Sequence, residues 1–517
     1  MNLRRCIAPY LLLALVSPAA IAEVPREKVP IELPAPITQI ETDQGTILGN
    51  LSGNSVLFKG IPYARPPIGP LRWKPPQPVA RRNGTLSARN FGPRCPQARL
   101  AKSGGTSEDC LTLNIATPAS ALMSTTDSLP VFFSIHGGGF VNGSGQPVFA
   151  AAPVLNTNGI ILVTMNYRLG ALGFYAHPLL DMKQGANFAL LDLVAALRWV
   201  HDNIDAFGGD PERVTIQGIS AGGQAVNMLM VNPSARGLFA GAIAQSGYGA
   251  WPLQPHLESL LDATESPSAE QVSAAIASRA SGKNASELQI KELYSLSAEQ
   301  LYGAIHGFYL PIIDGITLPE ETAVMFARGQ QHPVPYISGG TSFDGSVFPL
   351  SGVSEETVLG LTGNQKEQAQ ALWAEDFSAG GNQGIKRLFG DIRYLHSGWT
   401  ASRSMAAIHQ PGHLYLFDYL PPDTRDQQAG AAHGSDGTAL WTDYRSTTAQ
   451  MMREYWINFV KTGNPNGEAL PHWKTANAGV QSTNWLLFGE QVAPAKDIRN
   501  ARLQFIDQLW RARVAMP

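Results

Sequence analysis

The chain has 517 residues, of which 44% are hydrophobic and 15% are charged, a balance typical of folded globular proteins rather than disordered or fibrous ones. It carries 38 basic and 41 acidic residues, a net charge of −3, and no basic run that could neutralise a phosphate backbone. The composition therefore excludes a disordered chain and argues against nucleic acid as a partner.

The N-terminus has the three parts of a secretory signal peptide, which we assign to residues 1–22. Arg4 and Arg5 supply the positive start, Ile7 to Val16 the apolar stretch, and Ala20-Ile21-Ala22 a cleavage site of small residues before Glu23. The apolar stretch is about half the roughly 20 residues that a membrane-spanning helix needs. We therefore expect a mature chain without a membrane span, located in the periplasm or secreted.

The part of the chain that follows predicts a small N-terminal antiparallel sheet and a disulfide. Ile37 to Lys59 has the pattern of short antiparallel strands. Cleavage of the signal peptide removes Cys6, and the remaining Cys95 and Cys110 are an even count in an oxidising compartment. A bridge between them would close a loop of about 15 residues and stabilise the fold by about 3 kcal/mol. The alternative is two buried free thiols.

From Asp127 onward, apolar runs alternate with helical stretches, which predicts an α/β fold with a central, mostly parallel sheet flanked by helices. The expected strands are Leu129 to Ile135, Ile160 to Met165, Val214 to Gln217, Val334 to Ser338 and His413 to Phe417. Asn187 to Ile204 has an apolar face at helical spacing. Glu258 to Gln300 is polar and helix-forming, which indicates a helical insertion that acts as a lid or wall. Since no repeat or long linker divides the chain, we expect one domain over residues 23–517.

The most informative segment is the Gly-x-Ser-x-Gly motif centred on Ser220. A β-branched run enters the motif and Gln224 to Val231 leaves it as a helix, which is the strand–turn–helix order of a nucleophile elbow. In such a turn the serine would project at the start of a helix, where free amides and the positive end of the helix dipole favour a developing negative charge. The alternative is an ordinary glycine-rich turn.

Acyl transfer by a serine also needs hydrogen-bond donors aimed at the tetrahedral oxyanion. The strand ending at Ile135 runs into His136-Gly137-Gly138-Gly139-Phe140, where consecutive glycines leave backbone N–H groups open to a substrate oxygen. With the N–H of Ala221, the amides of this run would form an oxyanion hole of three donors. We interpret His136 as a packing residue, because the base follows the serine in the chain order of this fold.

The serine also needs a base and an acid, which follow it in the order serine, acid, histidine. His433 stands out among the later histidines because it lies in a loop of small residues, Ala431 to Asp436, that could hold an imidazole near the elbow. Asp344 follows an expected strand and would lie beside the site. By chain order alone four other aspartates compete with it, namely Asp314, Asp376, Asp391 and Asp418.

Nearly the whole mature chain resembles the type-B carboxylesterases of the carboxylesterase/cholinesterase family, which have the α/β-hydrolase fold. The matching segments occur in one order along the chain: Phe58 to Ala64, Pro67 to Arg72, Ser107 to Asn114, the glycine run at Gly137, Asn166 to Gly170, Phe207 to Pro211, the elbow, and Trp456 to Phe459 before Gly463 to Asn466. The resemblance implies hydrolysis of a small-molecule carboxylic ester through an acyl-enzyme intermediate. We expect no metal and no cofactor, because the sequence has no ligand cluster at metal spacing and no cofactor-binding loop.

The resemblance also implies roles for individual residues. It places Ser220, Asp344 and His433 on the family's triad, and Gly138, Gly139 and Ala221 on its oxyanion donors. It places Cys95 and Cys110 on a disulfide, and Trp251 in the pocket for the acyl group. It further implies two structural ion pairs, Arg72 with Glu108 and Arg168 with Asp192.

The chain departs from the family pattern beside the nucleophile. Most members have glutamate just before the serine, whereas this chain has Ile219, so a carboxylate that would attract cations is missing. The segment from Arg99 to Ser107 has no tryptophan, the aromatic platform that cholinesterases use for quaternary ammonium. Neutral or anionic esters are therefore expected over choline esters. Lipase, thioesterase and amidase reactions could use the same triad, and a non-catalytic binding module is the alternative outside enzymes.

Overall fold

The computed structural model describes residues 38–97, 105–123, 128–255, 267–443, 445–479 and 482–516. The predicted signal peptide and its cleavage site lie outside these residues. Residues 36–517 form one compact unit. No helix in the described ranges is both long and apolar enough to cross a membrane.

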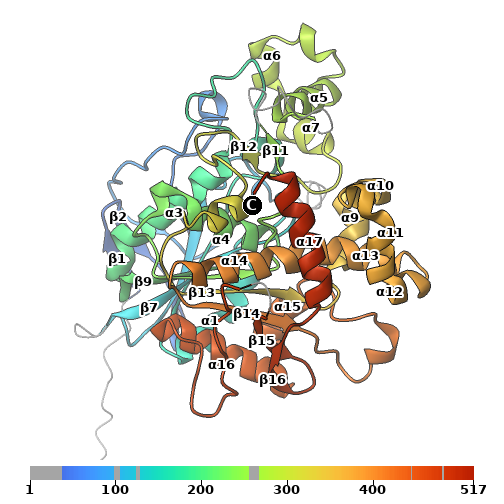
Figure 1. Cartoon of the computed structure of the whole chain (residues 1–517). Coiled ribbons are helices and arrows are strands. Elements are labelled where there is room, and N and C mark those ends of the chain that lie inside the picture. Colours follow the sequence, from blue (N-terminus) through green and yellow to red (C-terminus); the bar gives the residue numbers. More distant parts are fainter. Residues whose placement is uncertain are drawn as a thin grey trace, which may run out of the picture. The chain divides into compact units, whose positions relative to one another are not determined.

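An eleven-stranded sheet forms the centre of this unit (Figure 1). In spatial order its strands are β16 (Val492–Lys496), β15 (Asn484–Phe488), β14 (Gly412–Phe417), β13 (Tyr336–Thr341), β10 (Gly241–Gln245), β9 (Gly209–Ile219), β7 (Leu129–Ile135), β8 (Ile161–Met165), β6 (Thr112–Pro118), β4 (Ser55–Pro62) and β3 (Asn50–Ser52). The strands from β15 to β8 are mutually parallel. Antiparallel strands complete both edges. The sheet is thus mostly parallel, as the sequence predicts.

Two smaller sheets lie beside the large one. The N-terminal sheet consists of β1 (Gln39–Thr42), β2 (Gly45–Leu48) and β5 (Leu86–Ser87). β1 and β2 are antiparallel, as predicted, and β5 joins β2 in parallel. β11 (Gln254–Pro255) pairs with β12 (Ile312–Ile313). The rest of the predicted N-terminal strand region, β3 and β4, extends the edge of the large sheet instead.

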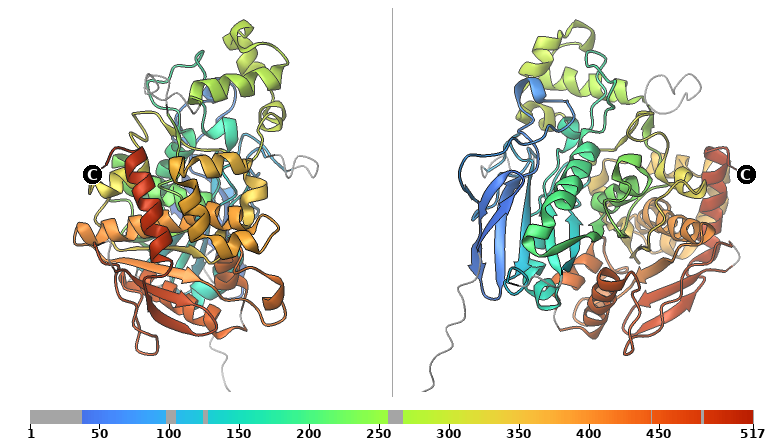
Figure 2. Two further views of the ribbon diagram at one scale, coloured as in Figure 1. Left: turned by 45° about the vertical axis from the view of Figure 1, so that its right-hand side comes forward. Right: turned by 90° about the vertical axis from the view of Figure 1, so that its left-hand side faces the viewer.

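Helices surround the large sheet (Figures 1 and 2). They are α1 (Ala152–Thr157), α2 (Gly170–Gly173), α3 (Phe188–Asn203), α4 (Ala221–Val231), α5 (Ala269–Ser281), α6 (Ile290–Ser295), α7 (Ala298–Gly303), α8 (Thr322–Ala327), α9 (Phe348–Ser351), α10 (Glu355–Gly360), α11 (Lys366–Leu372), α12 (Ala374–Ser378), α13 (Gln383–Gly390), α14 (His396–Ala407), α15 (Ser435–Thr442), α16 (Thr447–Thr462) and α17 (Asn500–Arg513). A π-helical turn, Asp391–Leu395, joins α13 to α14.

Strand alternation divides the core between the two faces of the sheet. In β7, Val131, Phe133 and Ile135 pack in the cluster that contains the apolar faces of α3 and α4. Phe132, between them, packs in the cluster that contains α15 and α16. Because successive side chains of a strand point to opposite faces, both faces of the central strands are buried under helices. The helical insertion predicted over Glu258 to Gln300 corresponds, where described, to α5, α6 and α7, which lie together at one end in both figures.

Covalent and ionic links fix the loops near the carboxyl edge of the sheet. Cys95 and Cys110 form a disulfide, as the cysteine count predicts. Buried Arg168 holds Asp192 through a salt bridge of 2.7 Å. Arg72 donates to both carboxylate oxygens of Glu108. These contacts connect segments that are distant in sequence and leave none of their charges unpaired.

Loss of the disulfide is expected to destabilise the fold without changing its sheet. Replacing both Cys95 and Cys110 with serine removes a crosslink between residues 15 apart, so the free energy of unfolding should fall by about 3 kcal/mol. Urea unfolding of the two proteins, followed by fluorescence, measures the difference. Reductant should shift the wild-type midpoint toward that of the double variant and leave the variant unchanged. A wild-type midpoint insensitive to reductant would contradict the stabilising role.

Candidate active site

Ser220 lies between the end of β9 at Ile219 and the start of α4 at Ala221. Its backbone angles are φ 61° and ψ −121°, a conformation that residues with side chains rarely adopt. The Ser220 N–H donates to the carbonyl of Gln245 at 2.8 Å, which ties the turn to the end of β10. The sharp turn lifts the Ser220 side chain to the carboxyl edge of the parallel strands, where ligand sites form in open α/β sheets.

The glycines that flank Ser220 are required by close backbone contacts. A Cβ atom on Gly218 would lie 2.3 Å from the backbone of Gly222, and one on Gly222 would lie 2.2 Å from the carbonyl of Ile135. Both distances are far below van der Waals contact, and the neighbouring atoms belong to the backbone. The Gly-x-Ser-x-Gly pattern therefore follows from the approach of β7, β9 and α4 at this point.

His433 and Asp344 meet beside the serine turn, although they are far apart in sequence. The Nδ1 atom of His433 lies 2.7 Å from Oδ1 of Asp344, and both side chains are buried. Nε2 of His433 is buried and has no hydrogen-bond partner among the described residues. Since Asp344 accepts from Nδ1–H, the imidazole would be held with a free electron pair on Nε2.

The Asp344 carboxylate is fixed by further donors. The N–H of Thr341, at the end of β13, donates to Oδ2 at 2.9 Å. The hydroxyl of Ser246, the residue after β10, lies 3.0 Å from both carboxylate oxygens. The backbone of His433 is held in turn, because its N–H donates to the hydroxyl of Ser346 at 2.9 Å. These contacts hold the Asp344 carboxylate in one orientation.

The aspartates that compete with Asp344 by chain order lie elsewhere. Asp314 accepts from Thr317 and neighbouring amides. Asp376 and Asp391 form salt bridges with arginines, and Asp418 is exposed. His136 is a packing residue, as the sequence analysis interprets it. Its ring stacks on that of Tyr167, and burial lowers its pKa to about 4.

A cavity of about 730 Å³ opens over Ser220. Its wall includes Gly137, Gly138, Gly139, Ile219, Ser220 and His433. Tyr302 at the end of α7 and Ile305 after it contribute a further part of the wall, so the helical insertion borders the cavity. The structure thus brings the predicted serine, histidine and glycine run to one cavity, with Asp344 behind the imidazole.

The amides of Gly138, Gly139 and Ala221 remain available at this cavity. Gly138 has φ 117° and Gly139 has φ 62°, values that favour glycine and turn the backbone of this loop. None of the three N–H groups donates to an acceptor within the described parts of the chain. Ala221 is the first residue of α4, so its amide adds the partial positive charge of a helix N-terminus.

Comparison with known proteins identifies the family of the chain. Residues 36–506 match the model of the carboxylesterase family. The chain belongs to the carboxylesterase family. Carboxylesterase 1E of Mus musculus is 30% identical, with 92% of this chain and 94% of that protein covered. Fumonisin B1 esterase of Sphingopyxis macrogoltabida is 32% identical over 84% of this chain and 83% of its own length. The solved structure of a pNB esterase superposes with a TM-score of 0.77 at 29% identity, covering 91% of this chain and 99% of that one.

This carboxylesterase is a carboxylic ester hydrolase with the α/β-hydrolase fold, as the sequence predicts. Ile219, which replaces the usual glutamate, lines the cavity. Its side chain packs closely on Gly437, because a Cβ atom added to Gly437 would lie 2.1 Å from Cδ1 of Ile219. No carboxylate is among the described residues that form the cavity wall. The cavity of this carboxylesterase therefore offers an ammonium group no direct counter-ion.

Three residues around the carboxylesterase site escaped the sequence analysis. Ser246 directly follows β10 and contacts Asp344, a position that the carboxyl edge of a parallel sheet could have suggested. The ring of Tyr394 lies 4.7 Å from that of His433. Arg393, in the same π-helical turn, is buried nearby. Trp251, the predicted acyl-pocket residue, is buried against Phe389 and the Arg393 guanidinium.

Proposed function

We propose that this enzyme cleaves carboxylic esters with Ser220 as nucleophile, His433 as general base and Asp344 as the acid that orients it. The 2.7 Å contact between His433 and Asp344, with the free Nε2 of His433 in the cavity that Ser220 lines, carries the proposal. It is the arrangement in which a serine hydroxyl can transfer its proton while it attacks a carbonyl.

The proposed reaction has two half-reactions through one acyl-enzyme. Nε2 of His433 takes the Ser220 proton as Ser220 Oγ bonds to the ester carbonyl carbon, and the carbonyl electron pair moves onto oxygen. The N–H groups of Gly138, Gly139 and Ala221 stabilise that oxyanion. Collapse expels the alcohol, which takes the proton from His433. Water then attacks the acyl-enzyme by the same route and releases the carboxylic acid.

Covalent labelling tests the nucleophile. A fluorophosphonate should react with the enzyme in a ratio of one to one with loss of fluoride, and mass spectrometry of the digest should find the adduct on Ser220. Prior occupation of the cavity by a slow ester substrate should delay labelling. An adduct on another serine, or no adduct on active enzyme, would remove the proposal.

Substrate charge is the second part of the proposed function. We expect neutral esters to be hydrolysed with a kcat/KM about tenfold or more above that of choline esters with the same acyl group, because Ile219 leaves the cavity wall without a carboxylate. A matched control is the neutral 3,3-dimethylbutyl ester, which has the shape of choline without its charge. Faster hydrolysis of the choline ester than of this control would contradict the expectation.

We also propose that the chain is exported after removal of residues 1–22. The charged start, apolar stretch and Ala20-Ile21-Ala22 cleavage site support this, as does a disulfide between Cys95 and Cys110. N-terminal sequencing of the protein isolated from cells is expected to begin at Glu23. An intact N-terminus on fully active cell-associated protein would contradict it.

A further inference from the structure

Arg393 is a buried cation surrounded by aromatic rings. It is 1% exposed, and no acidic side chain within the described ranges forms a salt bridge with it. Its guanidinium carbon faces the rings of Tyr248 at 4.2 Å, Trp251 at 4.7 Å, Phe389 at 5.7 Å, Tyr394 at 5.7 Å and Phe308 at 6.0 Å. Aromatic faces stabilise a desolvated cation, but they do not supply hydrogen-bond acceptors for its N–H groups.

Two other buried arginines of this chain hold a carboxylate through Nε and Nη2, the edge of the guanidinium that carries no such contact in Arg393. Arg168 donates to Asp192 through Nε at 2.9 Å and Nη2 at 2.7 Å. Arg72 holds Glu108 through the same two nitrogens. In Arg393, Nε and Nη2 are both buried, and apart from the neighbouring hydroxyls of Tyr248 and Tyr394 they have no hydrogen-bond partner among the described residues. The guanidinium thus presents the geometry of a two-bond carboxylate contact with no carboxylate in place.

Two tyrosine hydroxyls beside Arg393 also lack an acceptor for their protons. The hydroxyls of Tyr248 and Tyr394 are buried beside Arg393, and their O–H groups donate to no acceptor in the described part of the chain. Burial raises the pKa of Tyr394 to about 12, while the charge of Arg393 lowers it, so the hydroxyl stays protonated and can donate. Burial also raises the pKa of Tyr248. The cluster therefore contains several unused donors, and it needs an acceptor with negative charge.

This cluster adjoins the proposed catalytic residues. The ring centre of Tyr394 lies 5.7 Å from the guanidinium carbon of Arg393 and 4.7 Å from the imidazole of His433. Phe308 lines the cavity, and its ring centre lies 6.0 Å from the guanidinium carbon of Arg393. Phe308 is only partly buried, so rotation of its side chain would open the guanidinium to a group bound in the cavity. A substrate at Ser220 is therefore within a short chain's reach of Arg393.

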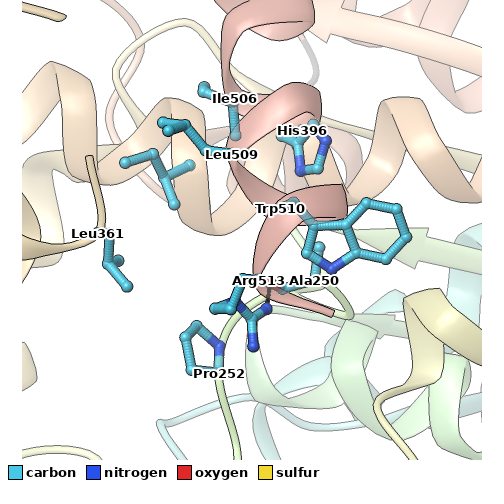
Figure 3. A pocket seen from close by; sticks show the side chains of 9 residues that line it. Ala250, Pro252, Leu361, His396, Ile506, Leu509, Trp510 and Arg513 are labelled. Atoms are coloured by element: carbon cyan, nitrogen blue, oxygen red, sulfur yellow. Dashed lines mark hydrogen bonds between the residues drawn. The ribbon is translucent and has the colours of Figure 1, made fainter. Parts of the chain in front are cut away.

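A second, smaller cavity is lined by residues that neighbour Arg393 in the sequence, but it has no unpaired charged group among the described residues. Figure 3 shows this space of about 30 Å³, lined by His396, Trp510 and Arg513 among others. It has room for one water molecule. Its charged groups are already paired, because Arg513 donates to Glu321 at 2.6 Å and His396 lies 3.3 Å from Asp507. The unused donors therefore belong to the Arg393 cluster, which contacts the active-site cavity through Phe308 and His433.

We propose that Arg393, with the hydroxyls of Tyr248 and Tyr394, binds a free carboxylate carried by the ester substrate. The inference rests on the proposed function of Ser220 and His433 and names its substrate class: half-esters of dicarboxylic acids, or esters of hydroxy acids. In both classes the charged group lies a few carbons from the scissile bond. Its two oxygens would accept from Nε and Nη2 of Arg393 and from the tyrosine hydroxyls.

The test compares esters that differ only in a terminal carboxylate. On the acyl side, monoethyl adipate is compared with ethyl 6-oxoheptanoate, in which a methyl ketone replaces the carboxylate. On the alcohol side, the butyrate esters of 5-hydroxypentanoate and of 6-hydroxyhexan-2-one form the corresponding pair. We expect the wild type to prefer the carboxylate ester at least tenfold in kcat/KM in one of the pairs. The pair that shows the preference identifies the side that carries the charge.

Arg393→Met should lower this preference by about ten- to a hundredfold, the range for a hydrogen bond to a charged group. Arg403→Met is the matched control, since Arg403 is also buried and stacked, with its guanidinium 3.9 Å from the ring centre of Trp399, but its Nη2 donates to Ala478. It should leave the preference unchanged. If Arg393→Met does not fold, Tyr248→Phe provides the second measurement and should reduce the preference about three- to tenfold.

The outcomes separate this inference from the proposed function. No preference in either pair, or equal losses of both esters in Arg393→Met, would overturn the carboxylate site while the esterase assignment stands. A preference unchanged in Tyr248→Phe, with no folded Arg393→Met protein, would also overturn it. Failure of wild type to hydrolyse even the ketone esters would instead count against Ser220 and His433.

Discussion

Ser220→Ala is expected to lower kcat for a neutral ester by a factor of about 10⁶, the loss typical when the nucleophile of such a triad is removed. The oxyanion amides and the cavity remain, so a small rate above that of water should persist. Substrate binding should change little, because the hydroxyl acts in the transition state. Initial rates at saturating substrate, with enzyme concentration fixed by absorbance, measure the effect.

The same position stores backbone strain, which gives a second readout. Ser220→Gly should also lose activity, but it should raise the free energy of unfolding by about 1 kcal/mol, since glycine adopts φ 61° without a clash. Ser404→Ala is the control: this buried serine donates to a carbonyl within α14 and should keep full activity. Residual kcat within a hundredfold of wild type in Ser220→Ala would remove the serine from the mechanism.

The elbow could be predicted from sequence because all its determinants are local. Gly218, Ser220 and Gly222 lie within one turn, and the apolar run before them and the helix after them are visible as patterns. The apolar strands β7, β8 and β14 were predictable for the same reason. In contrast β10 reads Gly-Ala-Ile-Ala-Gln and has little strand signal, because neighbouring parallel strands supply its hydrogen bonds. Tertiary pairing outweighs propensity there.

The partners of the serine depend on contacts that chain order alone does not define. His433 and Asp344 are 89 residues apart and were separated from their competitors through the family resemblance, whereas the structure provides the contact itself. Tyr394 and Arg393 gave no sequence signal, and Ser246 follows β10, a strand that the sequence analysis did not predict. Each becomes notable only because folding brings it beside Asp344, His433 or a ring cluster. Single polar residues in apolar surroundings carry no pattern until their neighbours are known.

Asp344→Asn is expected to lower kcat about 10⁴-fold, the second largest effect we predict. An amide can turn its NH₂ toward Nδ1 of His433, which would favour the tautomer with the proton on Nε2 and remove the base. Asp344→Glu keeps a carboxylate and should lose less, about ten- to a hundredfold. The extra methylene of glutamate must fit beside Gly340, and the space there is small: a Cβ atom added to Gly340 would lie only 2.3 Å from Oδ2 of Asp344. Steady-state kinetics with one neutral ester measures all three enzymes.

A neighbouring carboxylate makes the comparison specific. Asp436 is also fully buried, but it accepts from Tyr415 at 2.6 Å and from Gln245 at 3.0 Å, and it forms no hydrogen bond with a histidine of the described ranges. Asp436→Asn should therefore lower kcat no more than about tenfold, through local repacking alone. An equal decrease in kcat in Asp436→Asn and Asp344→Asn would contradict the orienting role of Asp344. Any buried carboxylate near the site would then have the same effect as the one that lies 2.7 Å from His433.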